Sequence, residues 1–407
     1  MNTLKKYAFI ALAVVAIFNL SSCKEKVAPA AEEKPDTLIS SELKWSERLA
    51  LTLMKAHPEA YQIDDKMAPK WDYVHGLVLT SFEKLHLQTK NQVYYDYVKG
   101  YADVCIDSTG AIPSYKFSNY NIDMIEAGNI LFHLYETTND EKYLTAMQLL
   151  RKQLSEHPRT SEGGFWHKKR YPSQMWLDGL FMGAPFYAHY SVKFENGENL
   201  DDVAKQFDLI QKHSLDAETG LLYHGWDESR AMDWAHIEKG TSPNFWSRSL
   251  GWYAMALVDV LDYFPKDHPK QADLVQYLNQ LAAALTKYQH ESGLWYQVTD
   301  MGERKENYLE ASGTAMFAYA LAKGYNKGYL SEEYLAVAQK AFDGLTRDLI
   351  KIGKDGEVII TEACAVAGLG GNPYRDGSFD YYVNERKKDN DPKATGPFIM
   401  AALELDR

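Results

Sequence analysis

Hydrophobic positions recur at helical spacing from Trp45 almost to the end of the chain. Trp45, Leu49 and Leu53 share one face of a predicted helix, whereas Lys44 and Lys55 lie on other faces. Some predicted helices are amphipathic and charged, for example residues 141–154 and 331–350. Others are apolar on nearly all sides, which predicts burial on all sides: residues 176–190, 246–264 and 310–324. The two kinds of helix alternate.

A recurring glycine turn separates the two helices of each pair. The motif begins with an acidic or hydroxyl residue, continues with one or two glycines and ends in apolar or aromatic residues. It recurs at five places: Gly110, Gly164, Gly220, Gly293 and Gly356. The spacings of 54, 56, 73 and 63 residues are too long for tetratricopeptide or ankyrin repeats. Long β-branched runs are scarce, so a core built from a sheet is not expected.

The pattern therefore predicts an all-α protein, an (α/α)6 barrel of six helical hairpins with the apolar helices inside. An open helical solenoid is the alternative. In the barrel, the glycine loops gather at the end where the inner helices begin. We expect these loops to carry the functional residues, because function concentrates on loops held by a rigid scaffold.

The first 22 residues follow a different pattern. Lys5 and Lys6 precede an apolar run over residues 7–20, which is short for a permanent membrane span and typical of a secretory signal. The run ends in Leu-Ser-Ser-Cys, which resembles a bacterial lipobox. The resemblance implies that residues 1–22 are a lipoprotein signal peptide and that Cys23 is lipidated. The alternative is an ordinary signal peptide with an incidental cysteine.

Residues 23–40 have no apolar periodicity and are predicted to form a lipidated tether, followed by one folded domain over residues 41–407. We thus expect a protein that is lipid-anchored to the cell envelope of a Gram-negative bacterium, on the periplasmic face or the cell surface. Cys105 and Cys364 are too few for a disulfide framework or a zinc site, and we expect buried free thiols.

Composition narrows the range of functions. The formal charge is −12 without a long basic tract, so general nucleic-acid binding is not expected, and a mean hydropathy of −0.42 excludes a multi-pass membrane protein. An aromatic content of 13 % in an acidic chain suits a sugar-binding surface, although a large aromatic core also explains it. Phosphate-loop, dinucleotide and serine-nucleophile motifs are absent, and the histidines do not fall at zinc spacing. We therefore predict neither a cofactor nor a metal.

Two aspartates interrupt apolar surroundings at the predicted starts of inner helices. Asp123 follows Asn121 and Ile122, and Asp178 lies between Leu177 and Gly179. An ionised aspartate in such surroundings is costly unless it is paired. Two acids in one pocket can divide into a proton donor and an anion. The alternative is that each acid stabilises a helix start.

Three further residues are candidates for substrate contact. His224 follows a glycine turn, and Arg248 and Trp252 lie four residues apart on one face of a predicted helix. Arginine pairs with oxyanions and an indole stacks on a sugar ring, so this pair suits an anionic sugar. The alternatives are a structural histidine and a surface cation–π pair.

Several motifs in order resemble those of glycoside hydrolase family 105, the unsaturated rhamnogalacturonyl hydrolases, and less closely those of the family 88 unsaturated glucuronyl hydrolases. The resemblance covers about residues 45–405. It rests on five segments: Asn121–Asp123, Trp166–Lys168, Met175–Met182, Trp246–Trp252 and Tyr308–Met316. The family has the (α/α)6 barrel fold, in agreement with the repeat.

The resemblance implies roles for these residues. Asp178 is the general acid and base, and Asp123 is the second essential carboxylate. Residues implied to contact the unsaturated sugar or its neighbour are His224, Arg248, Trp252, His167, Lys168 and Trp176. The two glycines at 163 and 164 depart from the family pattern as an extended turn.

The resemblance also implies a reaction. The enzyme would act on lyase-generated rhamnogalacturonan oligosaccharides and remove the 4,5-unsaturated uronic acid from the non-reducing end. Asp178 would protonate C4 of the enol ether and water would add at C5, after which the hemiketal opens and releases the neighbouring sugar, unlike ordinary glycoside hydrolysis. The alternatives are glucuronyl substrates from ulvan, arabinogalactan or glycosaminoglycans, and a non-catalytic sugar-binding lipoprotein.

Overall fold

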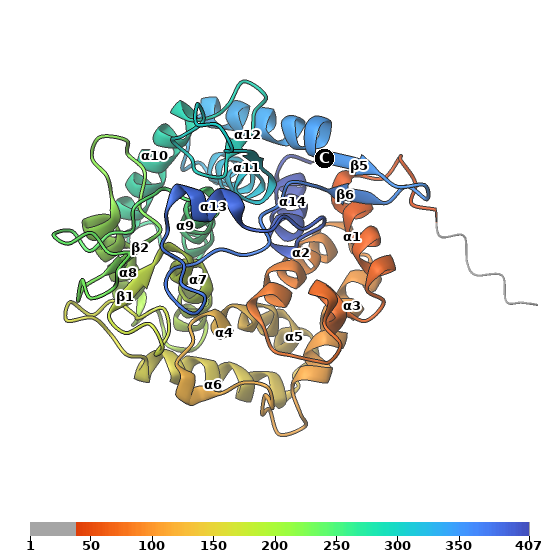
Figure 1. Ribbon diagram of the computed structural model, residues 1–407. Coiled ribbons are helices and arrows are strands. Elements are labelled where there is room, and N and C mark those ends of the chain that lie inside the picture. The colour runs from red at the N-terminus through yellow and green to blue at the C-terminus, as the bar shows by residue number, and fades with distance from the viewer. Residues whose placement is uncertain (1–37, 407) are drawn as a thin grey trace, which may run out of the picture. The chain divides into compact units, whose positions relative to one another are not determined.

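The computed structural model describes residues 38–406, which contain two concentric rings of helices (Figure 1). The predicted signal peptide, Cys23 and most of the predicted tether lie outside the described residues. The inner ring contains α2 (Tyr73–Thr89), α4 (Asp123–Glu126) with α5 (Ile130–Thr138), α7 (Leu177–Phe194), α9 (Ser247–Val260), α11 (Ala311–Asn326) and α14 (Pro392–Glu404). The outer ring contains α1 (Trp45–Ala56), α3 (Gln92–Cys105), α6 (Glu141–Glu156), α8 (Leu200–Ser214), α10 (Gln271–Lys287) and α12 (Glu332–Gly344).

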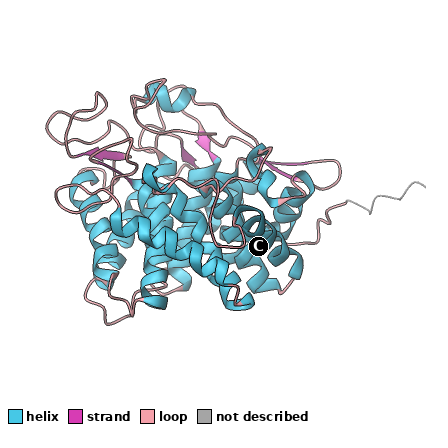
Figure 2. Cartoon of the chain, turned by 90° about the horizontal axis from the view of Figure 1, so that it is seen from below, coloured by secondary structure: helices cyan, strands magenta, loops and turns pink. Residues whose placement is uncertain are grey.

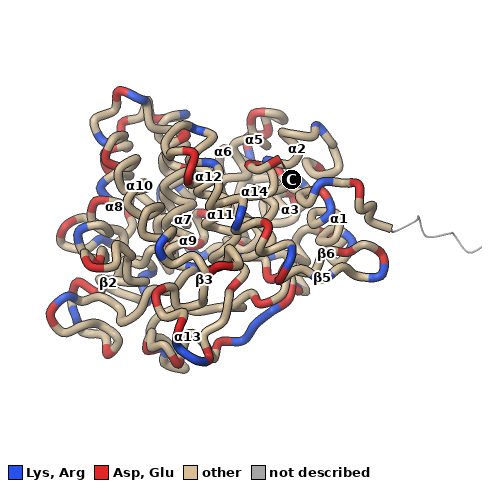
Figure 3. Tube along the Cα trace, turned by 90° about the horizontal axis from the view of Figure 1, so that it is seen from above, with Lys and Arg blue, Asp and Glu red and all other residues tan. Residues whose placement is uncertain are grey.

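The inner ring is closed. Each inner helix packs on the next one in chain order, and α14 packs on both α11 and α2. The six hairpins thus form the predicted (α/α)6 barrel, and the open solenoid is excluded. In α11 every residue from Ala311 to Gly324 is buried, as the apolar pattern predicts for an inner helix. Charged residues of both signs are spread along the periphery and the loops (Figure 3).

One predicted helix changes in kind near its end. The expected helix over residues 331–350 is an α-helix as far as Gly344 and a π-helical turn over Leu345–Leu349, and the strand β5 (Ile350–Ile352) follows directly. This strand pairs antiparallel with β6 (Val358–Ile360). The isoleucines of β5 satisfy their backbone groups in a hairpin with β-branched residues of β6, which competes successfully with helix formation.

The few strands belong to the loops rather than to a core sheet. β1 (Gln174–Trp176) pairs with β2 (Gly225–Asp227), and β3 (Trp295–Tyr296) pairs with β4 (Leu309–Glu310). The short helix α13 (Phe379–Asn384) lies over the inner ring with them. The strands and the longer loops gather along one side of the helical layers (Figure 2).

The recurring glycines make the predicted turns, with one correction. In the second turn Gly163 has the positive φ (+97°), whereas Gly164, used above for the spacing, does not. A Cβ atom at Gly164 would lie 2.1 Å from Met175 Sδ, so this glycine is required for close packing instead. The other four turn glycines are in the left-handed region, and each of the five turns joins an outer helix to the following inner helix. The hairpin after α1 has a 3₁₀ segment, Ala60–Asp65, in its place.

One smaller expectation, on the cysteines, is confirmed within residues 38–406. Cys105 and Cys364 are buried free thiols, as predicted. No helix in this part of the chain is both long enough and apolar enough to cross a bilayer.

Candidate active site

The predicted acids lie where inner helices begin, under the long loops. Asp123 is the first residue of α4 and Asp178 is the second residue of α7. Arg248 holds the corresponding second position in α9, and Glu310 is the N-cap of α11. Because the inner helices run in the same direction, these starts meet at one end of the barrel.

Asp123 is buried between a lysine and a histidine. Its Oδ2 lies 2.5 Å from Lys168 Nζ, and its Oδ1 lies 3.4 Å from His167 Nε2 without a hydrogen bond. Burial raises the pKa of Asp123, and Lys168 opposes that rise. Burial, together with the charge of Lys168, lowers the pKa of His167 well below its usual value, so the imidazole is neutral. The site therefore holds a carboxyl group whose protonation depends on one adjacent cation.

Backbone pairing fixes this arrangement. Ile122 N–H donates to the carbonyl oxygen of His167 (3.2 Å), and His167 N–H donates to that of Gln174 (2.7 Å). The loop that carries His167 and Lys168 is thus tied both to the start of α4 and to β1, which leads directly into α7.

Asp178 lies beside a second histidine, His224. Its Oδ2 lies 3.2 Å from His224 Nε2, and neither atom has a hydrogen-bond partner among the described residues. The other ring nitrogen, His224 Nδ1, is 2.7 Å from the hydroxyl of Tyr382. Leu177 N–H donates to the carbonyl oxygen of His224 (3.0 Å), which ties the histidine to the start of α7. The imidazole is fully buried and is held at the carboxylate by Tyr382.

An aromatic row connects the two carboxylates. Trp176 stacks with His167 at 4.3 Å between ring centroids and meets the ring of His224 edge-on at 5.5 Å. It also stacks with Tyr171 at 5.0 Å. Trp176 is buried, so its ring positions the two histidines, and the structure does not present it as an open sugar platform.

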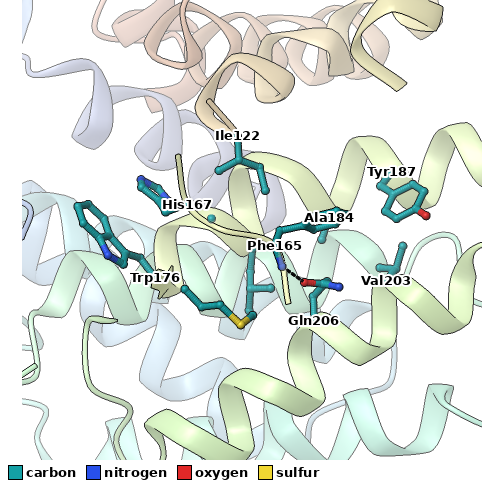
Figure 4. A pocket seen from close by; sticks show the side chains of 11 residues that line it. Ile122, Phe165, His167, Trp176, Ala184, Tyr187, Val203 and Gln206 are labelled. Atoms are coloured by element: carbon teal, nitrogen blue, oxygen red, sulfur yellow. Dashed lines mark hydrogen bonds between the residues drawn. The ribbon is translucent and has the colours of Figure 1, made fainter. Parts of the chain in front are cut away.

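A small cavity lies beside this row, and His167 and Trp176 are on its wall (Figure 4). Its volume of about 20 Å³ is close to that of one water molecule. Phe165 N–H donates to Gln206 Oε1 across the cavity wall at 2.8 Å. His167 Nδ1 has no hydrogen-bond partner among the described residues.

Arg248 is buried and firmly held. Its Nε donates to Ser312 Oγ (2.7 Å), its Nη2 donates to the carbonyl oxygen of Cys364, and Glu310 Oε1 lies 3.7 Å from Nη2. Glu310 itself accepts from the hydroxyl of Ser312 (2.7 Å). Nη1 has no hydrogen-bond partner within residues 38–406 and is the part of the guanidinium left for an oxyanion.

Trp252 lies one turn further along α9. It is 2 % exposed, and its ring packs against Phe181 of α7 at 4.9 Å and against Tyr73 of α2 at 6.4 Å. Trp252 therefore belongs to the apolar floor below the helix starts. The alternative of a surface cation–π pair between Trp252 and Arg248 is excluded, because both side chains are buried.

Two residues at this end of the barrel were missed at the level of sequence. Glu310 lies in one of the motifs, but the sequence assigned it no role. In the structure it lies beside Arg248 and accepts a hydrogen bond from Ser312. Tyr382 carries no motif and approaches His224 from 158 residues away in the chain. Within residues 38–406 no group of three or more histidine, cysteine or acidic side chains is arranged to hold a metal ion.

Comparison with known proteins gives the family. The chain matches the sequence profile described as Glycosyl Hydrolase Family 88 over residues 45–407. The solved structure of a family 105 glycoside hydrolase from C. acetobutylicum ATCC 824 is 43 % identical, covers 89 % of this chain and 99 % of its own, and has a TM-score of 0.86. The unsaturated rhamnogalacturonyl hydrolase YesR of Bacillus subtilis is 28 % identical over 276 residues, which are 66 % of this chain and 75 % of YesR.

Protein Atu3128 of Agrobacterium fabrum is 38 % identical over 229 residues, which are 55 % of this chain and 97 % of that protein. The family profile and the family 105 structure both extend over the barrel and its loops. The chain therefore belongs to the Glycosyl Hydrolase Family 88 group, in its family 105 branch, and the protein is a glycoside hydrolase of the unsaturated glycuronyl type.

Proposed function

We propose that the enzyme removes the 4,5-unsaturated uronic acid from the non-reducing end of lyase-generated rhamnogalacturonan oligosaccharides. The observation that carries the proposal is the pair of carboxylates at the helix starts, Asp123 beside Lys168 and Asp178 beside His224. The likeness to YesR, a rhamnogalacturonyl hydrolase by name, supports this substrate class.

The chemistry follows from the two carboxylates. Protonated Asp178 gives its proton to C4 of the enol ether, and the C5 centre gains oxocarbenium character. Water then adds at C5 and returns a proton to Asp178, and the hemiketal opens to release the leaving sugar. His224, held by Tyr382, lies at the carboxyl group through both proton transfers and orients it. Asp123 with Lys168 is the second, anionic group, and Arg248 Nη1 binds an oxygen of the substrate.

A panel of lyase-generated oligosaccharides tests the substrate. Hydration removes the C4=C5 double bond, so its ultraviolet absorbance falls as the reaction proceeds. We expect the highest kcat/KM on rhamnogalacturonan fragments. A higher kcat/KM on unsaturated glucuronyl fragments from ulvan, arabinogalactan or glycosaminoglycans would overturn the substrate assignment.

The same reaction in deuterated water tests the site of attack. Hydration places deuterium at C4 and removes the double bond, whereas direct hydrolysis leaves the C4=C5 bond intact and frees a hydroxyl at C1. NMR of the product distinguishes the two, and an intact double bond would show that the proposed mechanism is wrong.

We also propose that the mature protein is anchored to the cell envelope through a lipid on Cys23. The lipobox-like sequence before Cys23 supports this, and it lies outside the described residues. Cys23→Ala should move the protein from the membrane fraction to the soluble fraction, whereas Cys105→Ala, which removes a buried free thiol, should leave the distribution unchanged. Membrane association that persists in Cys23→Ala would contradict the anchor.

A further inference from the structure

A basic pocket lies next to Asp123, and of its lining residues only Lys168 has a part in the proposed reaction. It has a volume of about 550 Å³ and is lined by Ser118, Asn119, Asn121, Lys168, Lys169 and Arg170. We call these six residues the basic pocket. The whole chain carries a formal charge of −12, so three adjacent cations reverse the local charge.

A tight turn holds two of these cations out to solvent. Tyr171 N–H donates to the carbonyl oxygen of Lys168 (2.8 Å), which places Lys169 and Arg170 at the tip of a β-turn. Lys169 N–H donates to the carbonyl oxygen of Tyr120 (3.2 Å), which fixes the turn against the segment that precedes α4. Both tip residues are exposed, and their backbone is anchored on two sides.

The charges at the tip are unpaired. Lys168 is committed to Asp123, but no acidic group lies within 4.0 Å of Lys169 or Arg170 in the described part of the chain. Instead Lys169 Nζ lies 5.7 Å from the ring centroid of Tyr120, and Arg170 Cζ lies 4.9 Å from that of Tyr171. These aromatic contacts keep the two cations near the surface of the pocket without neutralising them.

The basic pocket is continuous with the site of the reaction. Lys168 lines the pocket and also contacts Asp123 Oδ2. Asn121 lines it as well, and its side-chain oxygen accepts from Asp123 N–H (3.2 Å). A sugar bonded to the unsaturated uronate at Asp123 would therefore extend the chain into or along this pocket.

We propose that the basic pocket binds an oxyanion, a carboxylate or a sulfate, on the leaving portion of the oligosaccharide. Lys169 and Arg170 supply the charge, and the hydroxyl and amide groups of Ser118 and Asn119 supply neutral hydrogen bonds. The inference rests on the proposed function and adds to it that the leaving portion is anionic, so that Lys169 and Arg170 are specificity-determining residues.

The test compares substrates that share one unsaturated uronate and differ only in the leaving portion, which is a neutral sugar, a sugar bearing a further uronate or a sulfated sugar. For the wild-type enzyme at low ionic strength we expect kcat/KM to be about tenfold higher with an anionic than with a neutral leaving portion, mainly through a lower KM. A tenfold ratio corresponds to about one charge-assisted hydrogen bond. Whichever anionic substrate shows the preference identifies the oxyanion. Added salt should reduce the preference.

The double variant Lys169→Gln with Arg170→Gln should abolish the preference by raising KM for the anionic substrate. Lys266→Gln is the matched control, because Lys266 is an exposed lysine in the loop after α9, at the other end of the barrel. This variant should keep the full preference for the anionic substrate. Equal kcat/KM for neutral and anionic substrates in the wild type, or a preference that persists in the double variant, would overturn the inference. Activity on the neutral substrate in either case shows that the proposed function still stands.

Discussion

Where the inner helices begin, Asp123 and Asp178 lie beside imidazoles and a lysine that arrive on loops. Deeper in the barrel another set of acids lines a cavity of about 220 Å³, and these acids include Glu83 of α2, Glu126 at the end of α4 and Asp259 of α9. Both regions of the barrel bury carboxyl groups, and they differ in what surrounds them.

The loops account for the difference. At the far end the helices are joined by segments of two to ten residues: 90–91, 139–140, 195–199, 261–270 and 327–331. The segments at the active end are longer, for example residues 215–246 between α8 and α9. The acids at the far end are paired with a cation from a helix and not from a loop: Lys323 of α11 lies 2.6 Å from both Asp259 and Asp262. Glu126, nearer the helix starts, lies against the first turn of α2, where Gly76 is required for its close approach. Its Oε2 has no hydrogen-bond partner among the described residues.

A shifted acid pKa by itself does not mark the active site. Burial raises the pKa of Asp123, but it also raises the pKa of Glu83 to about 8 and that of Glu126 well above its usual value. What separates the two ends is the set of loop-borne partners around the acid. Four predictions test this difference, and each of them changes one acid or one cation.

The largest effect is expected for Asp178→Asn. The amide cannot supply a proton, so turnover should fall by about 10²–10⁴ or more while the helical circular dichroism spectrum is retained. Glu83→Gln makes the same chemical change at the far end of the barrel and should leave kcat/KM unchanged. Near-normal turnover in Asp178→Asn would remove Asp178 from the mechanism.

The next effect concerns stability and not activity. Lys323→Met leaves Asp259 and Asp262 without their buried cation, so the free energy of unfolding should fall by about 3 kcal/mol. Denaturant unfolding measures the change, and kcat/KM well below the transition should be retained. Lys327→Met is the control: Lys327 lies 2.8 Å from Asp262 but is about half exposed, so its loss should cost less than about 1 kcal/mol. Equal losses in the two variants would contradict the role given to Lys323.

The third prediction removes the cation at the active end. In Lys168→Met the main group that offsets the burial of Asp123 is lost, so the pKa of Asp123 rises further and the carboxylate ionises only at higher pH. The acidic limb of the pH profile of kcat/KM should move upward by about one pH unit, a change of about 1.4 kcal/mol. Lys168→Arg, which keeps the charge, should restore the limb. The assay uses a substrate with a neutral leaving sugar, so that the basic pocket does not affect the result. If the acidic limb of the pH profile does not move, Lys168 does not set the pKa of Asp123.

The sequence predicts the barrel well because the barrel depends on local patterns. The apolar run over residues 310–324 forms α11, and the turn glycines mark five of the six junctions from outer to inner helices. The errors arise where local signals are ambiguous. Neighbouring Gly163 and Gly164 both fit a turn, and the isoleucines after Gly344 fit a helix as well as a strand until the partner strand β6 is known.

The site is predictable only in part, for a different reason. Asp123, His167 and Lys168 come together through pairing of two short segments, and the spacing of the motifs gives no sign of these contacts. Tyr382 reaches His224 from a part of the chain that carries no motif, so only the folded barrel brings them together. The roles of these residues in the reaction remain predictions.

The last prediction concerns stability at the far end and separates burial from catalysis. The pKa of Glu83 is raised from 4.5 to about 8 by burial, so the folded protein keeps this proton between those pH values while the unfolded chain has lost it. The stabilisation is complete below pH 4.5 and is lost as pH rises, with a slope of at most about 1.4 kcal/mol per pH unit. Glu83→Gln should remove this slope, so the variant gains stability relative to the wild type as pH rises from 5 to 8. Denaturant midpoints across that range measure the gain. If the two proteins lose stability in parallel, Glu83 is ionised in the folded state, and the far cavity would then hold a charge that the barrel has left unpaired.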